Sequence, residues 1–205
     1  MGELGSTAAD AVAAFGRRRA ATTALADEAE AVAATCQAMA ARFHAGGRLL
    51  TFGNGAAAAD AAHLAVEFVH PVIVGKRALP ALSLVNDPAT LTAALAAEGP
   101  DETFAAPLRC LAVPADIALG LSPDGECRNV ARALGVARAR GLLTVALVGG
   151  DGGRLAGSGD VDHLVVARSS DPAVVKEIHV TIYHVLWELV HVFLENPDSL
   201  TDGAA

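Results

Sequence analysis

His63 and Glu67 lie four positions apart in a segment whose apolar residues recur at helical spacing. Residues four apart share one face of an α-helix, so the two side chains can act together on one metal ion or one proton. A histidine–glutamate pair at this spacing is also a common contact on a helix surface. The pair is therefore a candidate functional site, and an ordinary surface pair is the alternative.

A tight turn comes directly before this helix, after an apolar run from Leu49 to Phe52 that is typical of a buried strand. Such a turn leaves backbone N–H groups at a helix N-terminus, where an anion can bind. Asp60 follows the turn and either caps it or faces the cleft. The candidate substrate-binding residues in this stretch are therefore Gly53, Asn54, Gly55 and Asp60.

The elements that must position these residues are indicated by apolar runs that alternate with helical patterns. Strands are expected at about 49–52, 81–85, 116–121, 142–148 and 163–166, and later helices at about 101–112, 126–140 and 172–195. Each strand is a nearly continuous apolar run, which is typical of a parallel sheet covered on both faces. The sequence therefore predicts an α/β fold, a three-layer doubly wound parallel sheet of five strands.

Ligands of such sheets bind at the carboxyl ends of the strands, near the topological switch point. The turns at 53, 122 and 149 all follow strands, so we expect them to converge on one cleft. Ser122 and Asp124 belong to the second of these turns and join the candidate substrate-binding residues. Asp87 is a further candidate, and it or Pro88 is expected to start the helix after the second strand.

The N-terminal segment 6–45 is rich in alanine, lacks proline and has apolar residues at helical spacing. It predicts one long helix or two, which must pack on the rest of the domain or on another subunit. Residues 1–5 and the polar tail 197–205 are expected to be loose. We therefore expect a single domain of residues 1–205, with a helical arm at about 6–45 and an α/β core at about 46–196.

Composition narrows the class of protein. The chain has 205 residues and a formal net charge of −8, which argues against direct binding of nucleic acid through its phosphates. It does not argue against a protein partner that itself binds DNA. Three scattered cysteines indicate a reducing compartment, and neither a signal peptide nor an apolar run of about 18 residues is present. We therefore expect a cytoplasmic protein without a membrane span.

Five segments in order resemble the SIS (sugar isomerase) domain family, in the branch of the phosphoheptose (sedoheptulose 7-phosphate) isomerases and the DnaA initiator-associating proteins. They are GNGAAAADAAHLAVEF (53–68), ALPALSL (78–84), DIALGLSPDGECRNVARALGVARARG (116–141), VALVGGDGGRLAG (145–157) and KEIHVTIYHVLWELV (176–190). The resemblance implies the SIS fold with a long N-terminal helix and no nucleotide cofactor. It also implies a homotetramer whose active sites lie between subunits.

The resemblance also implies a reaction and a site. Isomerisation of sedoheptulose 7-phosphate to a heptose 7-phosphate moves a proton between neighbouring carbons. It needs a base near one carbon, an acid or a polarising cation near the oxygens, and a phosphate cradle. At the matching positions, Glu67 and His184 are the acid–base pair. Zinc is held in the family by residues matching His63, Glu67 and His184, together with a glutamine eight residues before that last histidine.

Lys176 stands at this glutamine position. A protonated lysine is a poor metal ligand, and positions 176, 180 and 184 share one helix face, so Lys176 should point toward the site of His184. One hypothesis is that its ammonium replaces the metal and pairs with Glu67. The alternative is that Lys176 turns to solvent and a three-ligand zinc site survives. We expect zinc binding to be weak or absent.

The phosphate cradle departs from the family pattern as well. Family enzymes read GNGGSA and STSGNS where this chain reads GNGAAA and SPDGEC, so three expected serines are Ala57, Asp124 and Cys127. Ser122 remains, and backbone N–H groups do not depend on side chains. An Asn-Asp pair of the family's enzymes falls at Ala96-Ala97. Asp124 should repel a phosphate by about 1 kcal/mol or more at close range.

Three functions are consistent with these residues. The first is an isomerase of the phosphoheptose type acting on a sugar phosphate, with Glu67 and His184 as acid and base. The second is a non-catalytic relative that works through protein contacts, as DnaA initiator-associating proteins do. The third is an isomerase for a changed substrate, which Asp124 would permit.

Overall fold

The computed structural model describes residues 2–196 and residue 198. Within them, five strands form one parallel sheet: β1 (Leu49–Gly53), β2 (Ala81–Ser83), β3 (Ile117–Ser122), β4 (Leu143–Gly149) and β5 (His163–Ala167). The strand order is β2-β1-β3-β4-β5. The predicted doubly wound parallel sheet is therefore confirmed, and the chain reverses direction across the sheet between β1 and β3.

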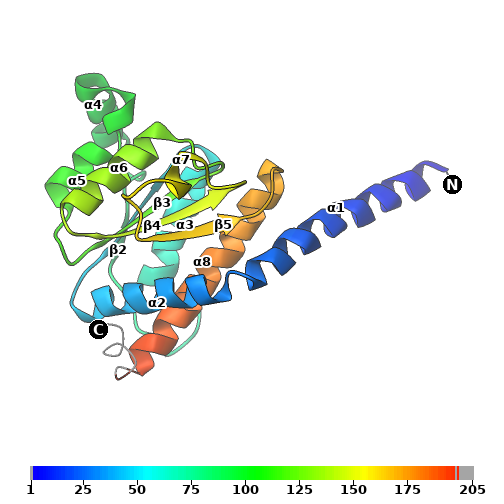
Figure 1. Cartoon of the computed structure of the whole chain (residues 1–205), viewed down its shortest axis with the longest axis horizontal. Helices are drawn as coiled ribbons and strands as arrows, with labels where there is room; N and C mark the ends of the chain where they lie inside the picture. Colours follow the sequence, from blue (N-terminus) through cyan, green and yellow to red (C-terminus); the bar gives the residue numbers. More distant parts are fainter. Residues whose placement is uncertain (1, 197, 199–205) are drawn as a thin grey trace.

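Helices cover both faces of the sheet, which gives the three predicted layers (Figure 1). On one face lie α2 (Ala29–His44), α3 (Ala56–Val69) and α8 (Pro172–Glu195), packed on one set of buried strand residues. On the other lie α5 (Ala105–Leu111) and α6 (Arg128–Ala139), packed on the alternate set. In β1, for example, Leu49 belongs to the first core and Leu50 to the second, because successive strand side chains point to opposite faces.

The N-terminal arm is two helices rather than one. The first, α1 (Gly2–Ala26), is separated from α2 by a turn at Asp27–Glu28 and projects away from the sheet (Figure 1). The expectation that residues 1–5 are loose is wrong for residues 2–5, because α1 begins at Gly2. Val12 and Phe15 on the projecting part are 71% and 69% exposed, so this half of α1 gains little from packing within the chain.

Two element boundaries differ from the sequence prediction. The helix expected at about 101–112 starts later: Asp101 lies in the 3₁₀ turn η1 (Pro100–Glu102) and pairs with Arg128, and α5 begins only at Ala105. The edge strand β2 ends at Ser83, because the chain turns there toward α4 (Pro88–Glu98). The remaining helix, α7 (Gly153–Ala156), is a single turn. The predicted loose tail lies outside the described residues, apart from Asp198.

The turns after β1, β3 and β4 converge, as predicted. Asn54 after β1 exchanges two side-chain hydrogen bonds of 2.8 and 2.9 Å with Asn129 at the start of α6. Gly149 at the end of β4 lies so close to the turn after β3 that a Cβ atom there would overlap the carbonyl oxygen of Pro123. Gly55 has φ of +56°, a conformation that favours glycine, and so lets α3 start directly after β1.

No helix among the described residues is long and apolar enough to cross a lipid bilayer.

Candidate functional site

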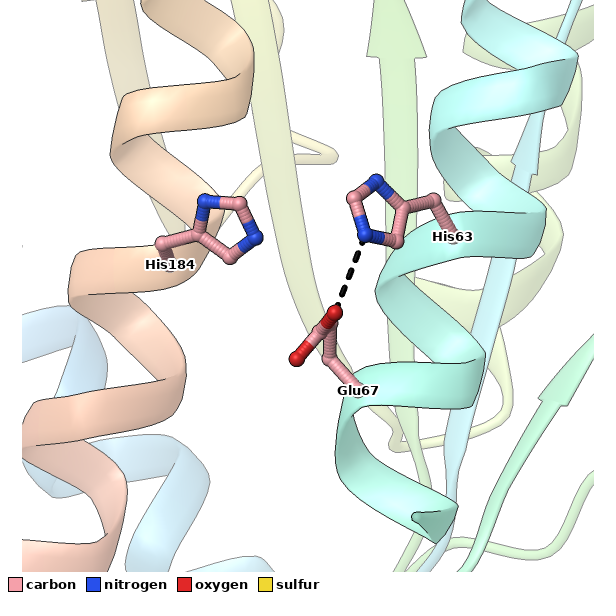
Figure 2. A group of neighbouring side chains, drawn as sticks. All are labelled: His63, Glu67 and His184. Atoms are coloured by element: carbon pink, nitrogen blue, oxygen red, sulfur yellow. Dashed lines mark hydrogen bonds and ion pairs between the residues drawn. The ribbon is translucent and has the colours of Figure 1, made fainter. Parts of the chain in front are cut away.

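The site is built by two helices that face each other on one side of the sheet. His63 and Glu67 come from α3 and His184 from α8, and Figure 2 shows the three side chains pointing into the space between the helices. One potential ligand atom from each residue lies within 4.8 Å of the others. A carboxylate from an early helix and an imidazole from the last one therefore meet within a single chain.

The pair on α3 is in direct contact. His63 Nε2 lies 3.0 Å from Glu67 Oε1, and the opposite ring nitrogen, Nδ1, lies 2.7 Å from the hydroxyl of Tyr183 on α8. An ionised carboxylate only accepts hydrogen bonds, so Nε2 carries the proton in this arrangement. The contact is more than a surface pair, because it is continued by a hydrogen bond into a second helix.

Burial differs among the three residues. Glu67 is only 9% exposed, whereas the His63 side chain is 44% exposed and His184 is open to solvent. Next to His184 on α8, burial raises the pKa of the Tyr183 phenol, and the nearby carboxylates of Asp60 and Glu67 raise this pKa further. Tyr183 is therefore protonated and able to donate a hydrogen bond at neutral pH. The site combines a buried carboxylate with two imidazoles that an incoming molecule can reach.

The donor set suits a divalent cation. Two imidazole nitrogens and one carboxylate oxygen are the three protein ligands that zinc often has in sites that keep a fourth position open. Because the donor atoms already lie within 4.8 Å of one another, small side-chain movements would bring them around one ion. The residues present therefore fit a zinc-type site with three protein ligands.

Lys176 satisfies neither of the two expectations for it. Its ammonium does not pair with Glu67; Nζ lies 2.6 Å from Oδ1 of Asp60, with the carbonyl of Ala56 at 3.4 Å. The lysine side chain is 44% exposed, but its charge is held by a carboxylate that is 7% exposed. Asp60 does not cap α3, which begins after Gly55 without a side-chain cap hydrogen bond; together with Lys176 it lines a small cavity of about 100 Å³.

In the turn after β3, side chains of the turn itself accept hydrogen bonds from its backbone N–H groups. The Ser122 hydroxyl accepts from the N–H of Gly125 at 3.0 Å, and the Asp124 carboxylate accepts from the N–H of Glu126 at 2.9 Å. Asp124 also lies 3.3 Å from the Ser122 hydroxyl. The Asp124 carboxylate thus occupies the N–H of Glu126, which is therefore not free for another anion.

Other candidates have structural roles. Asp87 caps α4, with Oδ1 accepting from the N–H groups of Ala89 and Thr90, so the expected helix start is confirmed and its carboxylate is engaged there. Ala96-Ala97 lies on α4 and offers no polar side chain. His191 is buried, and its Nδ1 and Nε2 lie 2.8 and 3.0 Å from the carbonyl oxygens of Trp187 and Arg77, so it has a structural role.

Tyr183 and Asn129 take part in the site region but were not among the predicted residues. Tyr183 precedes His184 on a helix whose apolar pattern favours core, so only its hydroxyl, which needs a partner when buried, could have singled it out. Asn129 follows the SPDGEC segment (122–127) by two residues, and nothing in the sequence indicates that it pairs with Asn54.

Fold and site together define a doubly wound α/β protein with a histidine–glutamate–histidine cluster between α3 and α8, on one face of its sheet. The family profile of the SIS domain matches residues 16–149. The chain belongs to the SIS domain family, as its sequence resemblance implied. The matched residues include His63 and Glu67, whereas His184 lies on the helix beyond them.

Phosphoheptose isomerases are among the proteins that this chain resembles. The phosphoheptose isomerase of Chlorobium phaeobacteroides is 43% identical over 161 residues, which are 78% of this chain and 71% of that protein. The structure of a phosphoheptose isomerase from Francisella tularensis superposes with a TM-score of 0.84 at 26% identity, covering 91% of this chain and 98% of the other. The enzyme from Neisseria gonorrhoeae gives 0.82 at 27% identity, covering 90% and 98%.

Proposed function

We propose that this protein is a sugar-phosphate isomerase of the phosphoheptose type, which interconverts sedoheptulose 7-phosphate and a heptose 7-phosphate. The observation that carries the proposal is the placement of Glu67 and His184 opposite each other, in a chain 43% identical to a phosphoheptose isomerase. The reaction class needs two groups that exchange protons with one substrate, and these two residues are the groups in reach.

In this proposal Glu67 is the base and His184 the acid. The carboxylate of Glu67 removes the proton from the carbon next to the sugar carbonyl and returns it to the neighbouring carbon. His184, which is open to solvent, delivers a proton to the carbonyl oxygen and takes one from the adjacent hydroxyl. Low exposure of Glu67 keeps its oxygens away from competing water, which strengthens the interaction with a bound sugar. His63 holds Glu67 in place through its 3.0 Å contact.

We further propose that His63, Glu67 and His184 hold a zinc ion, more weakly than a four-ligand site would. Bound there, the ion would polarise the oxygens of the sugar. Lys176 supports the weaker binding, because it contributes no ligand and its ammonium is already paired with Asp60. Because Lys176 does not pair with Glu67, its ammonium does not take the place of the metal, and the three ligands of the second alternative remain available.

We propose that the chain works as a single domain in a homo-oligomer, a tetramer in analogy with the family, in the cytoplasm. The site on one chain is open, and apolar side chains beside it are exposed, including Val66 between the two α3 residues at 51%. The following loop adds Val72, Ile73 and Val74, at 70%, 50% and 101%. Exposed apolar groups next to a site are typical of an interaction surface, so a second copy would both cover them and close the site.

The test is direct. Purified protein is mixed with sedoheptulose 7-phosphate, and formation of heptose 7-phosphate is followed by NMR. We expect turnover, and we expect Glu67→Gln and His184→Asn each to lower it by about 100-fold or more. Glu30→Gln removes an exposed carboxylate from α2 and should have no effect. Absence of turnover by the unmodified protein, at high concentration and with zinc supplied, would reject the isomerase.

The second candidate is a non-catalytic SIS-domain protein that acts through protein contacts, as in the DnaA initiator-associating proteins. It is favoured by the turn after β3, where Asp124 occupies a backbone donor that a phosphate would need. The third is an isomerase for a sugar without that phosphate. A protein that binds no sugar phosphate and turns over no sugar supports the second, whereas turnover of an unphosphorylated ketose supports the third.

A further inference from the structure

Tyr183 links the two helices of the site. It lies on α8 beside His184 in the sequence and is fully buried, at 0% exposed. Its hydroxyl lies 2.7 Å from Nδ1 of His63 on α3. The other ring nitrogen of His63 faces Glu67 at 3.0 Å. The imidazole of His63 is thus held from both sides, by one group of the site and by one buried phenol behind it.

The ring of Tyr183 also packs against both histidines. Its centroid lies 5.4 Å from that of His63 with the ring planes at 81°, and 4.9 Å from that of His184 at 66°. Edge-to-face packing of this kind limits the orientations that each imidazole can adopt. A single buried side chain therefore contacts the two histidines whose nitrogens define the site.

A phenol suits this position because its hydroxyl can both donate and accept a hydrogen bond. With the proton of His63 on Nε2, as the contact with Glu67 requires, the Tyr183 hydroxyl donates to Nδ1. When a ligand takes the lone pair of Nε2, the proton of the imidazole lies on Nδ1, and the Tyr183 oxygen accepts it. His63 can therefore change its tautomer without losing its hydrogen bond to α8.

We propose that Tyr183 is a positioning residue of the site: it fixes the ring of His63 so that Nε2 faces Glu67 and His184 in both tautomers. The inference rests on the proposed function only in taking these three residues as the working site. It goes beyond it by assigning a role to a buried residue that touches neither substrate nor metal. Partners of this kind behind metal-binding histidines orient the ring, and their loss weakens metal binding by about 10- to 100-fold.

The test uses Tyr183→Phe, which removes the hydroxyl and keeps the ring. Zinc affinity is measured by competition with a chromophoric chelator, and the histidine side chains are followed by ¹⁵N NMR in metal-free and zinc-loaded protein. We expect the dissociation constant for zinc to rise by about 10- to 100-fold. The Nδ1 resonance of His63 should also move in the metal-free protein, because it loses its hydrogen-bond donor. Circular dichroism establishes that the variant is folded.

The matched control is Thr35→Val, which removes another buried hydroxyl, one that donates to the carbonyl of Ala31 in its own helix. It should change neither the zinc affinity nor the spectrum of His63. The proposal is overturned if Tyr183→Phe leaves the Nδ1 resonance where it is in the unmodified protein. It is equally overturned if both resonance and zinc affinity change by the same amounts in Thr35→Val.

Two other results, a protein that binds no zinc and a variant that does not fold, still leave the role of Tyr183 testable. If the unmodified protein binds no zinc, the proposed metal site fails, and the metal-free ¹⁵N spectra still decide the role of Tyr183. If Tyr183→Phe does not fold, the unmodified protein provides the test, because Tyr183 is the one tyrosine in the sequence. Its hydroxyl proton should then exchange slowly and show a nuclear Overhauser effect to the ring of His63, and its absence would overturn the proposal.

Discussion

Lys176 Nζ lies 2.6 Å from Oδ1 of Asp60, two helical turns before the point where His184 meets His63 and Glu67. Residues 60 and 67 on α3 are matched by 176 and 184 on α8, so the two helices run side by side in the same direction. Lys176 and Asp60 neutralise each other near the N-terminal ends of the two helices. His63, Glu67 and His184 gather about two turns further along them. The positive charge of Lys176 is therefore kept apart from Glu67.

Removing the ammonium group of Lys176 should destabilise the fold, because the buried carboxylate of Asp60 would lose its charged partner. We expect Lys176→Gln to lower the free energy of unfolding by about 1–3 kcal/mol. Urea denaturation measures the change. Lys76→Gln breaks the ion pair with Glu195 at the surface and should cost less than about 1 kcal/mol. Equal losses in the two variants would argue against a structural role for the Lys176–Asp60 pair. The double variant Asp60→Asn/Lys176→Gln should recover part of the loss.

The turn after β3 should become a better anion site when its carboxylate is removed. We expect Asp124→Ser to strengthen binding of sedoheptulose 7-phosphate by about 1 kcal/mol, because it removes a repulsive charge and frees the N–H of Glu126. Isothermal titration calorimetry measures the affinity. Asp10→Ser is the control, since it removes an exposed carboxylate from the projecting helix α1. Unchanged affinity in Asp124→Ser would place the phosphate elsewhere.

The stability of the protein in acid should depend on Asp116, which is fully buried and directly precedes β3 in the sequence. Burial alone would raise the pKa of this carboxyl, but hydrogen bonds from the Arg48 side chain and from the backbone of Val113 and Arg48 outweigh it and hold the pKa below its usual value. A carboxyl whose pKa is lowered by folding stabilises the protein fully above the unfolded pKa of about 3.9. That stabilisation is lost as the pH falls through the lower folded pKa.

We therefore expect Asp116→Asn to lower the free energy of unfolding by about 1–3 kcal/mol at pH 7, since Arg48 would lose its charged partner. The difference from the unmodified protein should shrink as the pH falls from about 3.9, where the carboxyl of the unfolded chain becomes protonated, through the lower folded pKa of Asp116. Urea unfolding across this pH range makes the measurement. Asp27→Asn, at an exposed position between α1 and α2, serves as the control. A difference that is independent of pH would contradict the assignment.

Local sequence signals predicted much of the fold because they act over a few residues. The last helix begins at Pro172 as expected, where Asp171 accepts from the N–H of Ala173, and the apolar runs give the strands within a residue or two. The start of α5 was missed because Asp101, a residue type that favours caps, instead joins a 3₁₀ turn and an ion pair with Arg128. That choice depends on α6, which lies far along the chain.

The sequence was enough to predict which residues form the site, but not which of their side chains contact one another. Helical spacing puts Asp60, His63 and Glu67 on one face of α3, and Lys176 and His184 on one face of α8. Spacing does not fix how far one helix is shifted along the other, and this shift decides that Lys176 meets Asp60 rather than Glu67. The hydrogen bond of Tyr183 to His63 depends on the same shift, which is set by packing between the helices and the sheet.

Gly149 leaves no room for a side chain between itself and the carbonyl of Pro123. The loop after β4 and the loop after β3 are therefore in backbone contact, with nothing compressible between them. A molecule that displaces one of these loops has to displace the other, so the edge of the sheet that receives a ligand responds as one connected surface.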